Sequence, residues 1–377
     1  RSEALKRARL CAALSKPWVC PPESQGGNTK LPENYQSTGS RGVSNLEGKL
    51  LLALWPPGVP WFKLNLTAEA KYDPDAPPEM IQEFEYRLFL YELLILAQLE
   101  SSQLEPERKR RSGFRTHKRK VLSQLLVTGD ALEHLTDDYK LKLFRRDQYV
   151  TCRVSSGDVL YHIIRENVDP FGLPDKIRER AISSLGTKID NARTVKDRMQ
   201  DIYTRVEWQP LDGRWMIEQE MNGKIISQPS LETINPFIST SFELSPGENY
   251  GRGLCELNIG DLKSLDTLNL RLIEFAAMAS KHLAAIDNGG QTREEDLKAP
   301  SGSVFRAKVR GGRIDDVAFM SIDKVHDFTV VERVAGRIQE RLDKAFLVES
   351  EIQPTGDRVT KFQVQRIAAE LEGALGG

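Results

Sequence analysis

Few residues in this chain have the types and spacing that catalysis requires. Nucleotide hydrolysis needs a glycine-rich phosphate loop that ends in Gly-Lys-Ser or Gly-Lys-Thr. The nearest stretch, Gly186-Thr187-Lys188, lacks both the spacing and the second glycine. The sequence also contains no G-x-S-x-G elbow and no H-E-x-x-H pair. We therefore expect that the protein is not an enzyme.

Residues that bind metals are dispersed along the chain. The cysteines are Cys11, Cys20, Cys152 and Cys255, and the histidines are His117, His134, His162, His282 and His326. The cysteines form no CxxC pair, which in a chain of 377 residues is typical of free thiols in a reducing compartment. Isolated histidines are usually surface or core residues. We expect no metal site and no cofactor.

Basic residues are the clearest candidates for binding chemistry. Residues 108–120 hold eight Lys or Arg and no acidic residue. Such a run would suit contact with nucleic acid or the capsid, but a solvated loop and the start of a helix is the favoured interpretation. A helix predicted over residues 327–348 carries four further cations on the faces other than its apolar one. These cations would either line a channel or face water. They are Arg333, Arg337, Arg341 and Lys344.

The charge balance argues against a tight, general DNA-binding protein. The chain has 53 Lys or Arg and 54 Asp or Glu, a net charge of -1. Proteins that grip DNA mainly through its phosphates carry a basic excess. Residues 251–377 are also nearly balanced, with 18 basic and 20 acidic residues. Contact with DNA is not excluded, but strong adhesion is not expected.

Hydrophobic periodicity predicts several helices and a central β region. Helices are predicted over residues 1–16, around Leu46, Leu50 and Leu54, after Pro78, over 174–185, over 254–286, over 327–348 and from Thr360. In the helix after Pro78, a stripe for burial is predicted at Ile81, Phe84, Leu88, Tyr91 and Ile95. No segment reaches the roughly 20 apolar residues that span a bilayer, so we expect a soluble protein.

Strands are predicted mainly between residues 141 and 235. Residues 155–158 have the composition of a hairpin turn, and Asn222-Gly223 is typical of a tight one. Further strands are predicted at residues 61–66, 304–309 and 313–319. The fold class expected from these patterns is α+β.

Three stretches make the sequence similar to a known family. They are RGVSNLEGKLLLALWP at residues 41–56, ENYGRG at 248–253 with GDLKSL at 260–265, and QPTGDRVT at 353–360 with AAELEGALGG at 368–377. In this order they resemble the portal, or head-to-tail connector, family of short-tailed bacteriophages.

The resemblance implies a portal fold in defined segments. Residues 1–250 would form an α+β wing, and residues 251–286 and 327–348 would form stem helices. The small α/β clip would be residues 287–326, and the tunnel loop would be residues 349–360. Residues 361–377 would begin the helix that leads to a crown and barrel, which lie outside this segment.

The resemblance also implies partners and a location. Copies of the chain would assemble as a homo-oligomeric ring, expected to be a dodecamer, at one vertex of the capsid. Double-stranded DNA would pass through the channel during packaging and ejection. The expected protein partners are the terminase large subunit, the tail adaptor, the scaffolding and major capsid proteins, and internal core proteins. Assembly would take place in the host cytoplasm, without a membrane.

The resemblance assigns candidate sites within this arrangement. Gln353, Thr355 and Arg358 would face or gate the channel, although Arg358 would equally form a salt bridge between subunits. In the clip, four basic residues would dock the terminase motor or the tail adaptor. They are Arg306, Lys308, Arg310 and Arg313.

Two other functions would be compatible with parts of the sequence. A packaging ATPase would need the phosphate loop that the sequence lacks. A tail adaptor, or another ring-forming structural protein of the virion, remains an alternative, but an adaptor would be expected to be much smaller.

Overall fold

The computed structural model divides into two compact units, which we describe separately. Unit 1 is Arg1–Leu262 together with Leu342–Gly377, and unit 2 is Lys263–Arg341. The structure describes residues 1–23, 30–58, 60–67, 71, 77–100, 113–136, 141–186, 194–279, 283–286, 293, 295, 304, 306, 309–310, 313–314, 317–320, 325–348 and 361–375.

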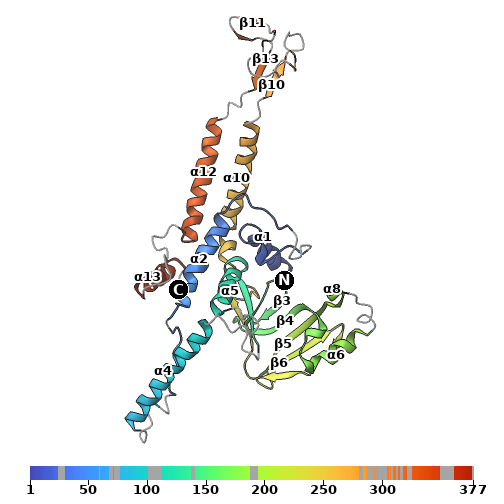
Figure 1. The fold of residues 1–377 in the computed structure, drawn as a ribbon, viewed down its shortest axis with the longest axis vertical. Helices are drawn as coiled ribbons and strands as arrows, with labels where there is room; N and C mark the ends of the chain where they lie inside the picture. Colours follow the sequence, from blue (N-terminus) through green and yellow to red (C-terminus); the bar gives the residue numbers. More distant parts are fainter. Residues whose placement is uncertain are drawn as a thin grey trace. The chain divides into compact units, whose positions relative to one another are not determined.

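Helix α5 (Phe114–Thr128) is the centre of the helical part of unit 1. It contacts α1 (Ser2–Ala13), α2 (Thr38–Leu54) and the short helix α9 (Leu254–Leu257), and it is therefore buried along most of its length (Figure 1). The predicted helix around Leu46 is confirmed. It ends just before Trp55-Pro56-Pro57, because proline cannot donate the hydrogen bond that would continue it.

The larger sheet of unit 1 is antiparallel and has six strands. These are β3 (Tyr149–Arg153), β4 (Val159–Val168), β5 (Gln200–Gln209), β6 (Arg214–Met221), β7 (Lys224–Ile225) and β8 (Ser230–Glu232). Strands β3 to β7 follow one another in order, and β8 also pairs with β6. The predicted Asn222-Gly223 turn is confirmed, with φ of 52° and 77°. Mixed helix and sheet make the fold α+β, as predicted.

A second sheet shares its core with the first. It has the order β2 (Leu141–Phe144), β1 (Asp130–Leu135) and β9 (Phe237–Ser241). Its Leu132 and Phe237 pack with Ile164 and Val206 of the larger sheet. On the larger sheet, helix α6 (Asp175–Leu185) adds a separate cluster through Ala181.

Unit 2 contains most of two long helices and two strand pairs. The helices are α10 (Ile259–Ala279) and α12 (Val325–Ala345), and Phe275 stacks on Phe328 with ring centroids 3.2 Å apart. The strands are β10 (Leu283–Ile286), β11 (Val309–Arg310), β12 (Arg313–Ile314) and β13 (Val317–Met320). Strand β10 pairs with β13, and β11 with β12. Strand β11 therefore overlaps the end of the strand predicted over residues 304–309, and both β12 and β13 overlap the one predicted over 313–319.

Two predicted elements are wrong. The single helix over residues 254–286 is two helices, α9 and α10, followed by strand β10. The apolar run of β10 is too short for periodicity to distinguish helix from strand, and pairing with β13 decides it. Residues 61–66 form no strand. The Leu64 backbone N–H instead donates to Oε1 of Glu92, at 2.6 Å.

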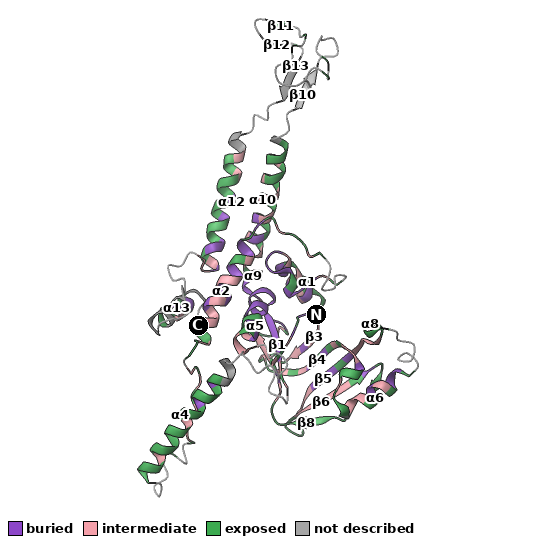
Figure 2. Ribbon diagram, viewed as in Figure 1, coloured by how far each residue is buried: buried purple, intermediate pink, exposed green. Residues whose placement is uncertain are grey.

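The predicted burial of the stripe on helix α4 (Pro78–Glu100) is also wrong. Phe84 is 47% exposed and Tyr91 is 58% exposed, whereas Glu92 and Leu96 are buried (Figure 2). Nine large apolar side chains of this helix are exposed, and we call them the α4 apolar face. They are Met80, Phe84, Tyr86, Phe89, Leu90, Tyr91, Leu93, Leu94 and Ile95. The prediction is wrong because this chain covers only the side of α4 that carries Glu92 and Leu96, and the predicted stripe lies mainly on the other sides.

Candidate functional site at the end of helix α12

The first sequence motif lies on helix α2, where it contacts the last turn of helix α12 within unit 1. Nη2 of Arg41 lies 2.9 Å from Oδ1 and 3.2 Å from Oδ2 of Asp343. The Asp343 side chain is 8% exposed, and that of Arg41 is 51% exposed. Solvent screening therefore reduces what this ion pair contributes to stability. Its position ties α2 to α12 across a sequence separation of 302 residues.

The last turn of α12 closes with a Schellman motif whose C′ residue is a leucine. Leu347 has φ of 53°, a left-handed conformation that usually requires glycine. Its N–H donates to Lys344 O at 3.1 Å, and the N–H of Val348 donates to Asp343 O at 2.8 Å. A non-glycine residue in this conformation costs about 1–2 kcal/mol, so the surrounding contacts must hold it in place.

Two side chains of α2 provide those contacts. Nδ2 of Asn45 donates to Leu347 O at 2.8 Å, and Nζ of Lys49 donates to the same oxygen at 2.9 Å. Asn45 also reaches Phe346 O at 3.3 Å. We call Arg41, Gly42, Asn45 and Lys49 the α12 clamp. The clamp fixes the point at which the chain leaves α12 and enters residues 349–360.

Gly42 allows the close approach of the two helices. A Cβ atom at this position would lie 2.6 Å from Cγ of Phe346, closer than any side-chain carbon can pack. Phe346 itself is fully buried. The glycine of the motif is therefore required by packing, not by backbone conformation.

A buried ion pair anchors α2 from its other side. Nζ of Lys16 lies 2.6 Å from Oε1 of Glu47, and both side chains are at most 8% exposed. Nε of Arg119 lies 3.5 Å from the other carboxylate oxygen of Glu47. Breaking a buried pair leaves an uncompensated charge, which costs about 3–5 kcal/mol. Glu47 therefore fastens α2 to the end of α1 and to α5.

The second motif forms a tight backbone crossing before helix α9. A Cβ on Gly253 would lie 2.7 Å from Leu126 O, and one on Gly251 would lie 2.7 Å from Gly129 O. Gly129 has φ of 83°, and its own Cβ would lie 2.4 Å from Gly251 O. Because these neighbours are backbone atoms, they cannot move aside. The glycines of the motif let the chain cross the end of α5 on its way to the long helix.

A buried aspartate and arginine support this crossing. Oδ1 of Asp130 accepts the Gly251 N–H at 3.0 Å and the Ser241 hydroxyl at 2.8 Å. The guanidinium of Arg146 lies 3.6 Å from Asp130 and 3.8 Å from the centre of the Tyr250 ring. Burial raises the pKa of Asp130, although the charge of Arg146 and these hydrogen bonds oppose the shift. The cluster connects the β1, β3 and α9 regions.

The basic run at residues 108–120 divides into two parts. Residues 108–112 lie outside the described residues. Farther along, Lys118 pairs with Glu133 at 2.8 Å, and Arg115 donates to Trp55 O. Burial alone would raise the pKa of Glu133, but hydrogen bonds from His117 and Lys118 outweigh it and lower the pKa. The described basic residues therefore favour the helix-start interpretation.

The predicted site residues fall into three groups. On α12, Arg333, Arg337, Arg341 and Lys344 are all exposed. In unit 2, Arg306 is exposed, and Arg310 and Arg313 are register partners in β11 and β12. Lys308, Gln353, Thr355 and Arg358 lie outside the described residues.

The α12 clamp was not among the predicted site residues. Its members lie in the first motif, yet nothing in their spacing indicates Asp343 or Leu347 as partners. The available signal was Glu47 and Lys49, two charged residues among the leucines of an otherwise apolar helix. Such residues are rarely buried unless they are paired. Helix α13 (Lys361–Leu375) also contacts α2, and it begins one residue after Thr360, from which a helix is predicted.

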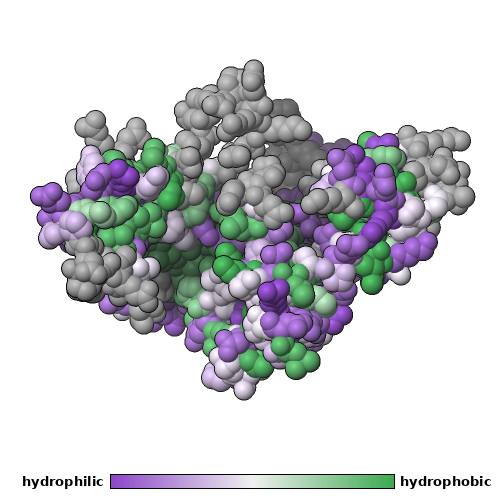
Figure 3. Space-filling view, turned by 90° about the horizontal axis from the view of Figure 1, so that it is seen from below, coloured by the Kyte–Doolittle hydropathy of each residue, from purple (hydrophilic) through white to green (hydrophobic). Residues whose placement is uncertain are grey.

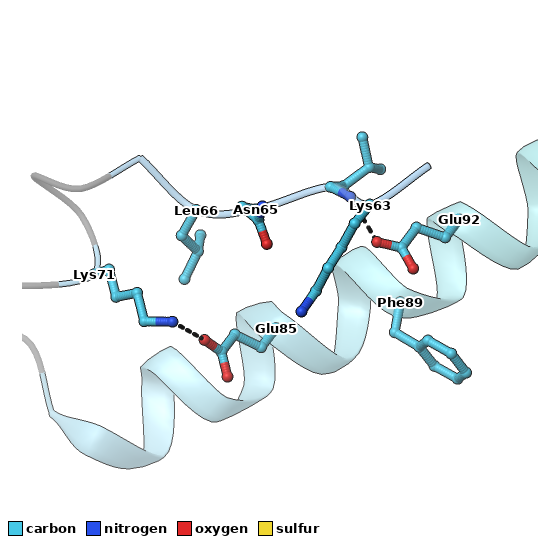
Figure 4. Close-up of a pocket in the computed structure, with 8 residues that line it drawn as sticks. Lys63, Asn65, Leu66, Lys71, Glu85, Phe89 and Glu92 are labelled. Atoms are coloured by element: carbon cyan, nitrogen blue, oxygen red, sulfur yellow. Dashed lines mark hydrogen bonds and ion pairs between the residues drawn. The ribbon is translucent and has the colours of Figure 1, made fainter. Parts of the chain in front are cut away.

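A groove of about 640 Å³ lies between α4 and residues 63–71. Figure 4 shows Lys71 directed at Glu85, with 3.2 Å between their charged atoms. In the lining of the groove, Glu85 pairs with Lys71 and Glu92 accepts the Leu64 N–H, so both acids already have a partner.

The described residues show no sign of a metal site or of a reactive thiol. They contain no group of three or more His, Cys, Asp or Glu that would hold a metal ion. Burial raises the pKa of Cys255 to about 12 and that of Cys20 to about 11, so both thiols stay protonated at neutral pH. Within the same part of the chain, we find no helix with the length and hydropathy to span a membrane.

Comparisons with known proteins agree with this architecture. The family model for the bacteriophage head to tail connecting protein matches residues 1–377. The chain is 31% identical to the portal protein of Enterobacteria phage T3 and 30% identical to that of Escherichia phage T7. Each match covers 98% of this chain and 67% of the relative. Similarity to a solved gene transfer agent virion, with a TM-score of 0.35 and 10% identity, is too weak to add to the assignment.

The chain therefore belongs to the bacteriophage head-to-tail connecting proteins. A protein of this class is a structural component of the virion, and the α12 clamp and the glycine crossing are the parts of its fold that the family motifs encode.

Proposed function

We propose that this chain is a portal subunit. Copies of it would form a dodecameric ring at one capsid vertex, through which double-stranded DNA passes during packaging and ejection. The observation that carries the proposal is the α12 clamp, which holds the strained carbonyl of Leu347 at the start of residues 349–360. A segment that projects into a bore must leave a fixed point, since repeated subunits place it identically around an axis.

The proposal assigns a role to each segment. Residues 1–250 form the wing, residues 251–286 and 327–348 contribute the stem, and residues 287–326 form the clip. Residues 349–360 are the tunnel loop, in which Gln353, Thr355 and Arg358 face the DNA. The exposed cations of α12, which include Arg333 and Arg337, face the stem channel. The near balance of charge supports this role, because DNA must slide and not adhere.

The proposal also includes partners. The clip residues Arg306, Lys308, Arg310 and Arg313 dock the terminase large subunit and later the tail adaptor. The wing meets the scaffolding, major capsid and internal core proteins. The ring assembles in the host cytoplasm and remains in the virion, where it acts as a conduit and not as an enzyme.

Electron microscopy of the purified protein tests the proposal directly. We expect rings with an open axial passage at least as wide as duplex DNA. Native mass spectrometry of the same sample gives the number of subunits, which we expect to be twelve. A monomer, or an assembly with no central passage, would overturn the proposal.

A further inference from the structure

Helix α4 has its polar and apolar sides reversed relative to an ordinary surface helix. Between Leu88 and Ala97 the only charged residue is Glu92. It is 7% exposed, and its carboxylate accepts the Leu64 N–H at 2.6 Å. Glu85, one heptad earlier on the same side, pairs with Lys71. The polar side of α4 thus faces its own chain, as Figure 4 shows, and the apolar side faces outward.

The outward side is too large and too apolar to be left in water. Phe89, Leu90 and Leu94 are 49%, 41% and 58% exposed, and they lie at different angles around the helix. At about 200 Å² for a large side chain, the nine members of the α4 apolar face leave on the order of 900 Å² exposed. Contiguous patches on monomers rarely exceed roughly 600 Å², so this surface is built to be covered. Figure 3, a view from below, shows hydrophobic surface in green.

We infer that the α4 apolar face is an interface with a second copy of this chain. The inference rests on the proposed ring, in which every subunit has two identical neighbours. The exposed area matches the ~800 Å² per partner that stable interfaces bury. Interfaces between identical subunits are also more apolar than those between proteins that exist separately. The exposed Glu83–Arg87 ion pair lies toward the N-terminal end of this face, but between Leu88 and Ala97 its outward side has no charged residue. That stretch must be covered as soon as it folds, and another copy made at the same time is always available.

Replacing Leu90 and Leu94 by glutamate tests the inference. These residues are one helical turn apart, so Leu90→Glu/Leu94→Glu places two charges within the contact. We expect ring formation, followed by mass photometry of the intact protein, to fall by about a hundredfold or more, because unpaired charges are buried poorly at interfaces. The matched control is Leu211→Glu, at a position that is 100% exposed between β5 and β6. It should assemble like the unaltered protein.

Crosslinking keeps the test independent of folding. The photoreactive residue p-benzoylphenylalanine, in place of Tyr91, resembles the aromatic ring it replaces. We expect crosslinks to a second copy of the chain, identified by mass spectrometry of mixed light and heavy isotope samples. Crosslinks confined to one copy or made to a shell protein, or normal assembly of Leu90→Glu/Leu94→Glu, would overturn the inference. If the unaltered protein forms no ring at all, the proposed function fails instead.

Discussion

Gly42 and Gly48 lie on the same helix but have opposite surroundings. The Cβ of a residue at position 42 would collide with the buried Phe346 ring, whereas a Cβ at position 48 would meet no atom within 4 Å. Both glycines belong to the first sequence motif. Sequence alone does not separate them, because the distinction comes from a partner about 300 residues away.

We predict opposite effects for alanine at these two positions. Gly42→Ala should lower the free energy of unfolding by about 1–3 kcal/mol, because overpacking forces α2 away from α12. Gly48→Ala should raise it by about 0.5–1 kcal/mol, since alanine loses less conformational freedom in a helix. Urea unfolding of both variants measures the difference. Equal effects would mean that the helices do not meet through Gly42.

His162 is a buried titratable residue within the larger sheet. It is 0% exposed, and its Nδ1 lies 3.0 Å from Oγ1 of Thr151. Burial, followed by the charge of Arg153, lowers the pKa of His162 to about 4. Because the unfolded histidine binds a proton near pH 6.5, the unfolded state gains protons first as the pH falls.

Stability should therefore fall between pH 6.5 and pH 4. For His162 alone, we expect a loss of about 2 kcal/mol from pH 7 to pH 5. The variant His162→Gln keeps a polar side chain but cannot titrate, so its unfolding free energy should fall by that much less over the same interval. Urea unfolding at both pH values, for both proteins, isolates this difference from the effects of the carboxylates. Identical pH dependence would show that His162 is protonated in the folded protein.

Helices and turns were predictable where their apolar residues are buried by the same chain or their conformation follows from local sequence. Leu46 of α2 packs inside unit 1 as predicted, although Leu54 at the end of the same helix is 49% exposed, and the Asn222-Gly223 turn follows from local chemistry. Prediction failed where the secondary structure or the burial of a segment depends on contact with another segment or another molecule. Strand β10 depends on pairing with β13, and the stripe on α4 is apolar for a surface that this chain does not cover.

Candidate site residues show the same limit. The exposure of Arg333 and Arg337 follows from helical periodicity, but the direction they face in an assembly does not. The α12 clamp could not be predicted, since a hydrogen bond from Asn45 to the carbonyl of Leu347 depends on the tertiary fold. Hydrogen bonds to main-chain atoms carry no sequence signal at the acceptor.

At the end of α12, the clamp should stabilise the junction with residues 349–360. The double variant Asn45→Ala/Lys49→Met removes both donors to Leu347 O while it keeps most of the lysine's apolar volume. We expect unfolding free energy to fall by about 2–4 kcal/mol, the sum of one neutral and one charged hydrogen bond. Urea unfolding provides the measurement, with Ser44→Ala on the same helix as control. A loss no larger than that of the control would show that the clamp does not hold this turn.

For the whole molecule, the two units differ in how their stability is built. Three hydrophobic clusters among the described residues of unit 1 include Leu132, Ala181 and Val121, and none of these three includes a residue from 263–341. After unit 2, the chain re-enters unit 1 at Leu342, and the side chains of Leu342 and Phe346 are fully buried there. In unit 2, Leu265, Ala335 and Ile338 are buried, but most of the other described residues of its long helices are exposed or half-buried.

Unit 1 should therefore fold without unit 2. We predict that a chain in which residues 263–341 are replaced by a flexible Gly/Ser linker of about 15 residues keeps a cooperative thermal transition and a near-UV circular dichroism spectrum. The shorter connection lowers the entropic cost of loop closure by about 1.5 kcal/mol, which partly offsets the loss of packing along α10 and α12. The same excised chain with Gly42→Ala should melt at a lower temperature, because α2 must still meet Phe346. A compact but non-cooperative chain would show that α10 and α12 are needed to fold the rest.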